Sequence, residues 1–91
     1  MDAAVSAPLR AIVVDDEPLA RRGLEIRLAV HADVQIVGYY GDGASAIGGL
    51  REHRPDLMFL DVQMPGMDGF QTLRAIPANE MPLVVFVTAY D

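Results

Sequence analysis

The 91-residue sequence contains no cysteine and no lysine. The absence of cysteine excludes a disulfide framework, a thiolate metal site and a cysteine nucleophile. All seven basic residues are arginine, so no side chain can form a Schiff base or act as a P-loop lysine. Thirteen acidic residues give a net charge of −6. This charge argues against direct nucleic-acid binding, which requires a basic surface.

The sequence also lacks any hydrophobic run of about 18 residues, the length that a membrane-spanning helix requires. Its first five residues carry an aspartate where a signal peptide carries positive charge. We therefore expect a cytoplasmic protein without a membrane partner. A chain of this length forms at most one domain. We expect that domain over residues 9–91, after a flexible N-terminal extension over residues 1–8.

Four short hydrophobic segments predict the strands of a β-sheet. They are Leu9–Val14, Val34–Tyr39, Leu57–Leu60 and Leu83–Val87. Their hydrophobic residues are continuous rather than alternating, which is typical of parallel strands that are covered on both faces. Clusters of glycine, proline or aspartate separate the segments.

The segments between these strands are long enough for crossover helices. Helices are predicted over Pro18–His31, Ala44–His53 and Phe70–Ile76. On the first helix, Ala20, Leu24 and Leu28 are spaced to form one buried stripe. In the second helix, Gly48 and Gly49 each lower helix stability by roughly 1 kcal/mol. The alternation of strands and helices predicts an α/β fold with a parallel sheet and right-handed crossovers.

Acidic or hydroxyl side chains follow three of the predicted strands. Asp15 and Asp16 follow the first strand, Asp61 the third and Thr88 the fourth. Because ligands of open α/β sheets bind beyond the carboxyl ends of the strands, we expect these side chains to meet. Each aspartate alone is most often a turn or cap residue. Two carboxylates about 5 Å apart, however, repel by roughly 3 kcal/mol at an effective dielectric constant of about 20, so a cluster requires a cation or a proton. Oxygen ligands favour Mg²⁺.

Four motifs together indicate a family. They are Val13–Pro18, Pro55–Asp61, Met64–Gly69 and Val87–Ala89. Each motif alone is weak, and the loop from 61 to 69 by itself fits an ordinary connection between a strand and a helix. In this order and spacing, the set resembles the receiver domain of bacterial response regulators. Residues 17–21 and 88–91 most resemble receivers that are attached to LytTR-type DNA-binding domains.

The resemblance implies a role for each site residue. Asp61 matches the phosphoacceptor, which takes a phosphoryl group from a sensor histidine kinase. Asp15, Asp16 and Asp61, with the backbone carbonyl of Gln63, match the Mg²⁺ ligands. Thr88 matches the switch hydroxyl that contacts the phosphoryl group after transfer. The resemblance thus implies a phosphoacceptor rather than an enzyme, with at most autophosphorylation and autodephosphorylation activity, that controls an attached output domain, most simply a DNA-binding domain.

The resemblance also implies a flavodoxin-like sheet of order 2-1-3-4 that is truncated after the fourth strand. The family fold has a fifth strand, which carries a lysine, and further helices. We therefore expect impaired switching in this fragment. The segment Leu83–Val87 would lie at an open sheet edge, and exposed hydrophobic edges pair with other chains. A homodimer or larger oligomer through this strand or through the first helix is expected.

Two alternative functions are open at this point. The first is a receiver-like interaction or dimerisation module that is never phosphorylated. The second is a dinucleotide-binding fragment, because Gly41–Ala46 fits the pattern G-x-G-x-x-A and Asp61 follows at a suitable distance. Asp42 counts against this second reading, since its carboxylate would face the pyrophosphate. Arg21 and Arg22 are expected to lie on a solvated face, or on a kinase-docking face by the resemblance.

Overall fold

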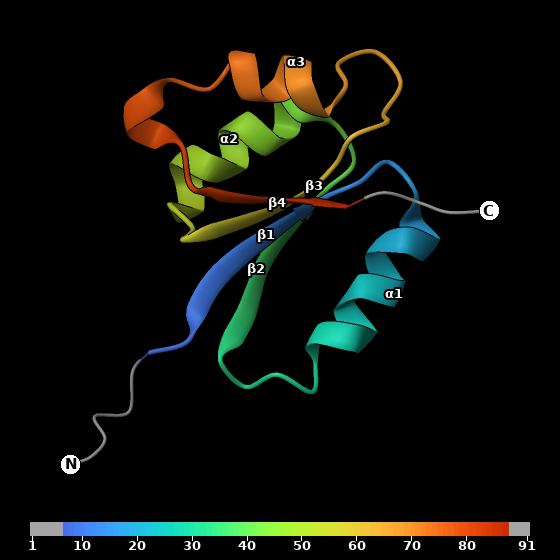
Figure 1. Ribbon diagram of the computed structural model, residues 1–91, viewed down its shortest axis with the longest axis vertical. Helices are drawn as coiled ribbons and strands as arrows, with labels where there is room; N and C mark the ends of the chain where they lie inside the picture. The colour runs from blue at the N-terminus through green and yellow to red at the C-terminus, as the bar shows by residue number, and fades with distance from the viewer. Residues whose placement is uncertain (1–6, 88–91) are drawn as a thin grey trace.

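The computed structural model describes residues 7–87, and Figure 1 shows their arrangement. The elements are β1 (Leu9–Val14), α1 (Pro18–Leu28), β2 (Val34–Tyr40), α2 (Gly43–His53), β3 (Leu57–Asp61), α3 (Gly69–Arg74), a short 3₁₀ helix η1 (Ala78–Glu80) and β4 (Leu83–Val87). This is the predicted alternation of strands and helices. The bounds of β1 and β4 agree with the prediction, whereas α1 and α3 end before their predicted last residues.

The strands form one parallel sheet in the order β2-β1-β3-β4. This order confirms the flavodoxin-like arrangement that the resemblance implied. In Figure 1, α2 and α3 lie on one face of the sheet and α1 lies on the other. Because β1 and β3 are neighbours at the centre, the residues that follow their carboxyl ends are brought side by side.

The hydrophobic core lies between the two central strands and α2. Its members are Ile12, Val14, Ala46, Leu50, Met58, Leu60, Met64 and Ile76. The expectation that strands are covered on both faces holds for β1, whose last four residues are buried. It is wrong for β4, where Leu83 is 68% exposed and Phe86 is 44% exposed, whereas the open sheet edge predicted for Leu83–Val87 is confirmed among the described residues. Within residues 7–87, β4 pairs with β3 alone and has no second neighbour.

The first helix packs more loosely than predicted. The predicted stripe of Ala20, Leu24 and Leu28 is wrong as a buried stripe, because Ala20 is exposed and the two leucines are only half-buried. The physical reason is that α1 contacts the sheet chiefly at β2, the edge strand, so much of its surface has no packing partner among the described residues. Among residues 7–87, none of the helices combines the length and the hydrophobicity of a membrane-spanning segment.

Candidate functional site

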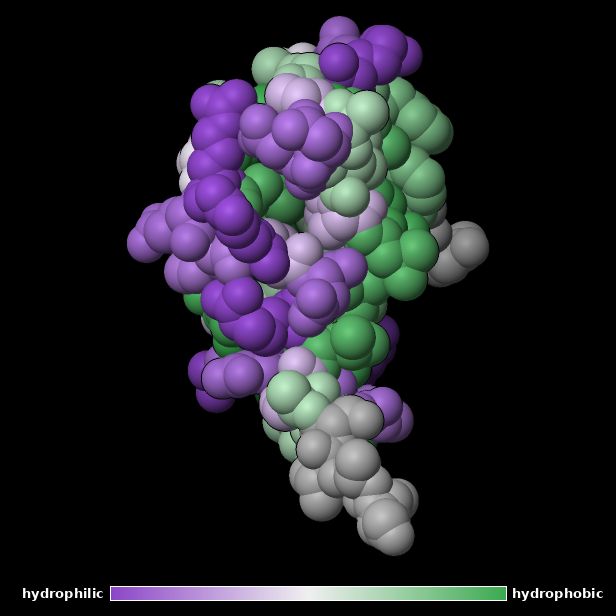
Figure 2. Space-filling view, turned by 90° about the vertical axis from the view of Figure 1, so that its left-hand side faces the viewer, coloured by the Kyte–Doolittle hydropathy of each residue, from purple (hydrophilic) through white to green (hydrophobic). Residues whose placement is uncertain are grey.

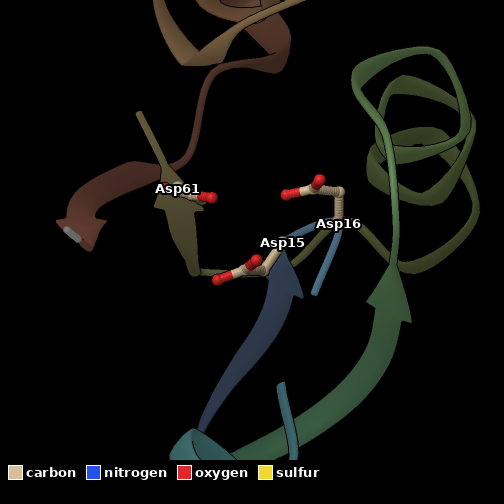
Figure 3. A group of neighbouring side chains, drawn as sticks. All are labelled: Asp15, Asp16 and Asp61. Atoms are coloured by element: carbon tan, nitrogen blue, oxygen red, sulfur yellow. The ribbon is translucent and has the colours of Figure 1, made fainter. Parts of the chain in front are cut away.

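Three aspartates meet at the carboxyl ends of the two central strands. Asp15 and Asp16 follow β1, and Asp61 is the last residue of β3. One carboxylate oxygen from each residue lies within 4.8 Å of the other two. Figure 3 shows the side chains of Asp16 and Asp61 pointing toward one another, with Asp15 beside them. The structure thus brings together the three aspartates that the sequence singled out.

Asp15 is the most buried of the three, with 8% of its surface exposed. Its backbone N–H donates to the carbonyl of Tyr40 at 2.9 Å. Its Oδ1 accepts a hydrogen bond of 2.9 Å from the backbone N–H of Glu17. Burial raises the pKa of the Asp15 carboxyl; the Glu17 N–H opposes this, and the neighbouring Asp61 and Asp16 raise the pKa further. The surroundings of Asp15 therefore favour a bound cation or a proton.

Asp61 is held by the loop that follows β3. Its Oδ1 accepts a hydrogen bond of 3.1 Å from the backbone N–H of Gln63. The same loop folds back so that the N–H of Gly69 donates to the carbonyl of Val62 at 3.0 Å. A Cβ atom at Gly69 would lie 2.7 Å from the carbonyl oxygen of Asp61, so only glycine permits this close approach. The predicted metal contact of the Gln63 carbonyl stays a prediction.

Sequence reasoning missed how the loop after Asp61 is closed. Asp68 accepts a hydrogen bond of 2.8 Å from the N–H of Gln71, and the Gln71 side chain accepts one of 2.9 Å from the N–H of Asp68. This reciprocal pair is a capping box at the start of α3. The signal was present in the sequence, since an aspartate is followed three residues later by glutamine at the start of a predicted helix.

Thr88, the predicted switch residue, lies outside the described residues. It directly follows β4, which pairs with β3 as far as Val87 opposite Asp61. The role of Thr88 therefore stays a prediction.

The start of α2 does not favour the dinucleotide alternative. The Asp42 side chain caps α2 by accepting a hydrogen bond of 2.8 Å from the N–H of Ser45, and this bond lowers the pKa of Asp42. A pyrophosphate would have to displace that carboxylate from the helix N-terminus. Gly43 is packed against Thr72 and Met67 rather than open to a ligand. Asp61, the proposed ribose ligand, lies in the acidic cluster instead.

Comparisons with known proteins point to a single family. A family model described as "Response regulator receiver domain" matches residues 11–91. Transcriptional regulatory protein BtsR of Salmonella typhi is 41% identical over 83 residues, which are 91% of this chain and 35% of that protein. The probable transcriptional regulatory protein NarL of Mycobacterium tuberculosis is 40% identical over 84 residues, which are 91% of this chain and 39% of that protein. The chain thus spans little more than a third of these curated relatives.

Solved structures support the same assignment. The signal receiver domain of the putative response regulator NarL from Mycobacterium tuberculosis is 39% identical, with a TM-score of 0.82 over 94% of this chain and 70% of that chain. The response regulator domain of Thermotoga maritima CheB is 30% identical, with a TM-score of 0.80 over 89% of this chain and 60% of that chain. The comparisons do not show the predicted LytTR subtype. The chain belongs to the response regulator receiver domain family of two-component systems.

Proposed function

We propose that Asp61 is the phosphoacceptor of this receiver domain and that a sensor histidine kinase supplies the phosphoryl group. The observation that carries the proposal is the meeting of Asp15, Asp16 and Asp61 at one edge of the sheet in a chain of this family. In the proposed step, an oxygen of Asp61 forms a bond to phosphorus while the bond from phosphorus to the donor histidine nitrogen breaks. The product is an acyl phosphate on Asp61.

The acidic cluster fits a divalent cation. Three carboxylates converge from adjacent strands, and the grouping contains no histidine or cysteine ligand. Such an all-oxygen set suits Mg²⁺, which is held by few carboxylates and keeps several waters. Asp15, Asp16 and Asp61 would hold the ion, together with the predicted carbonyl of Gln63. When bound, Mg²⁺ neutralises charge between the acceptor carboxylate and the phosphoryl donor.

The described residues orient Asp61 for this step. The N–H of Gln63 holds Oδ1, and the short loop back to Gly69 fixes the backbone around Asp61. Because one carboxylate oxygen is held, the other, Oδ2, is the oxygen that we propose to attack. Placement of this kind accounts for most of the catalysis in phosphoryl transfer, since the transition state is loose. Thr88 is proposed to donate its hydroxyl to the phosphoryl oxygens afterwards.

The direct test uses acetyl phosphate as the donor and intact mass spectrometry as the readout. With Mg²⁺, the wild-type chain is expected to gain the mass of one phosphoryl group. The gain should vanish in Asp61→Asn and in the presence of excess EDTA. Asp56→Asn is the matched control, because Asp56 precedes β3 at the opposite end of the strand. Phosphorylation of Asp61→Asn equal to wild type would overturn the proposal.

In the longer proteins of this kind, we propose that the receiver controls an attached DNA-binding output domain. Both BtsR and NarL are named as transcriptional regulators. Because this chain has a net charge of −6, we propose that the attached domain, and not this chain, contacts DNA. Because the proposed kinase and the proposed DNA target are both reached from the cytoplasm, we propose that the chain is cytoplasmic.

The exposed fourth strand favours a second candidate function, which is homodimerisation. Leu83, Val85 and Phe86 are 68%, 38% and 44% exposed. The ring of Phe86 packs on that of Phe70, which is also half exposed, with the centroids 5.3 Å apart. Exposed apolar edge strands pair readily with a second edge. We propose that two copies of this 91-residue chain associate through β4.

Sedimentation equilibrium tests the dimer. The wild-type chain is expected to dimerise in a concentration-dependent manner, and Val85→Lys is expected to shift it to the monomer because a charge at the edge opposes pairing. Ile26→Lys is the control on α1, the other predicted contact, where Ile26 is 58% exposed. A wild-type chain that is monomeric at all concentrations would reject the dimer. If only Ile26→Lys dissociates it, the dimer contact lies on α1 rather than on β4.

A further inference from the structure

Arg21 connects α1 to the loop that carries the acidic pair. Its Nη1 donates a hydrogen bond of 2.6 Å to the backbone carbonyl oxygen of Asp15, in a partly buried setting. We infer that Arg21 is a positioning residue, which holds Asp15 and Asp16 in place for the metal site; this inference rests on the proposed function. The expectation that both arginines lie on a solvated face is correct for Arg22, whose side chain is 71% exposed. It is wrong for Arg21, which is half-buried.

Three hydrogen bonds fix Asp15, and each acts on a different atom. The N–H donates to Tyr40, Oδ1 accepts from Glu17, and the carbonyl oxygen accepts from Arg21. The first two come from backbone N–H and C=O groups, so most substitutions would leave them in place. The third comes from a charged side chain and is therefore the strongest single restraint that a point mutation can remove.

The carbonyl of Asp15 belongs to the planar peptide unit that continues into Asp16. Because that unit is rigid, the direction of the carbonyl sets the orientation of the N–H and Cα of Asp16. Arg21 therefore acts on both members of the acidic pair through one bond. Its guanidinium also lies close to the loop after β2, since a Cβ atom at Gly41 would be 3.4 Å from Nη1. The guanidinium thus lies where the loops after β1 and β2 meet.

The bond opposes a force that the acidic cluster creates. Asp15, Asp16 and Asp61 carry like charges within 4.8 Å, and without a cation their repulsion drives the loop after β1 away from β3. A hydrogen bond that pins the Asp15 carbonyl keeps the ligands close before the ion arrives. Residues that orient metal ligands in this way typically change metal affinity about 10- to 100-fold when they are mutated.

An electrostatic role and a positioning role of Arg21 predict opposite changes in Mg²⁺ affinity for Arg21→Met. If the arginine acted only as a positive charge near the site, its removal would tighten Mg²⁺ binding. If it positions the ligands, removal weakens binding even though a repelling charge is lost. Methionine keeps an unbranched stem and removes both the donor and the charge. The sign of the change in Mg²⁺ affinity therefore separates the two roles.

Isothermal titration calorimetry of Mg²⁺ into the whole chain measures whether the affinity rises or falls. For Arg21→Met the dissociation constant is expected to rise about 10-fold. Arg21→Lys should recover part of the loss, since lysine keeps one donor and the charge. Arg22→Met removes the same charge from the next residue and should change the constant less than about 2-fold, as expected for an exposed charge. Binding by Arg21→Met as tight as wild type, or tighter, would overturn the inference.

Amide hydrogen exchange in the metal-free protein supplies a readout that does not depend on the ion. Arg21→Met should accelerate exchange at the N–H groups of Asp15 and Glu17 while that of Met58, in the centre of β3, stays unchanged. Equal acceleration at all three would mean general destabilisation and would reject the inference. Wild-type protein that binds no Mg²⁺ would reject the proposed function instead. If Arg21→Met does not fold, the comparison of Arg21→Lys with wild type decides both readouts.

Discussion

The ring of Tyr40 occupies the space in which a side chain at Gly49 would begin. A Cβ atom built at Gly49 would overlap the ring, whereas at Gly48, one residue earlier in α2, nothing lies within 4 Å. Gly38, on the same strand as Tyr40, also faces this ring. Gly48 and Gly49 therefore differ in their structural roles. Gly49 makes room for a packed tyrosine, and Gly48 only costs helix stability.

This difference predicts opposite effects of two neighbouring substitutions. Gly49→Ala should lower the free energy of unfolding by about 1 to 3 kcal/mol, because the Tyr40 ring must move out of a packed position. Gly48→Ala should raise it by about 0.5 to 1 kcal/mol, because alanine is favoured over glycine within a helix and has open space here. Urea unfolding of both variants measures the two signs. Equal changes would contradict the packing of Tyr40 against Gly49.

The close approach of Gly69 to Asp61 predicts that this glycine is needed for the site. Gly69→Ala should place its Cβ against the carbonyl oxygen of Asp61 and push the strand end away from Asp15. We expect a loss of about 1 to 3 kcal/mol in stability, the usual cost of overpacking. The rate of phosphorylation by acetyl phosphate should fall more than the stability alone explains. Gly23→Ala, in open space on α1, is the control; unchanged phosphorylation in Gly69→Ala would refute the assignment.

Repulsion within the acidic cluster predicts that removing one charge stabilises the metal-free protein. Asp16→Asn should raise the free energy of unfolding in EDTA by about 1 kcal/mol, a value reduced from the Coulomb estimate because Asp16 is half-buried and solvent screens it. Mg²⁺ should raise the melting temperature of wild type but have little effect on this variant. Thermal melts with EDTA and with Mg²⁺ provide both comparisons. A variant less stable than wild type in EDTA would contradict the proposed repulsion between the aspartates. A variant that Mg²⁺ still stabilises fully would contradict the role of Asp16 in holding the ion.

Local patterns in the sequence were sufficient to predict the sheet and the acidic cluster. The continuous hydrophobic segments place Asp15 and Asp61 at strand ends, because an aspartate directly follows the first and the third segment. The parallel fold then places those ends side by side, because β1 and β3 are neighbours. The resemblance to receivers supplied the strand order, which the segments alone leave open. These inferences depend on short stretches of chain and on one topology rule.

Contacts between secondary-structure elements could not be predicted from the sequence. The spacing of Leu24 and Leu28 predicts which side of α1 is apolar, but not whether a neighbour covers that side. The pairing of Tyr40 with Gly49 joins β2 to α2, and no periodicity reveals it. Arg21 was expected to be solvated because long charged side chains usually are. Its bond to the Asp15 carbonyl depends on the direction in which α1 leaves the loop after β1.

The most direct test of the central claim is ¹⁹F NMR with beryllofluoride, which takes the place of the phosphoryl group on an aspartate. The account predicts protein-bound fluorine signals for the wild-type chain in Mg²⁺ and their loss in excess EDTA. The signals should also be lost in Asp61→Asn and persist in Asp68→Asn, which keeps a side chain that can cap α3. Bound signals that persist in Asp61→Asn, or that are absent from the wild type at saturating Mg²⁺, would contradict it.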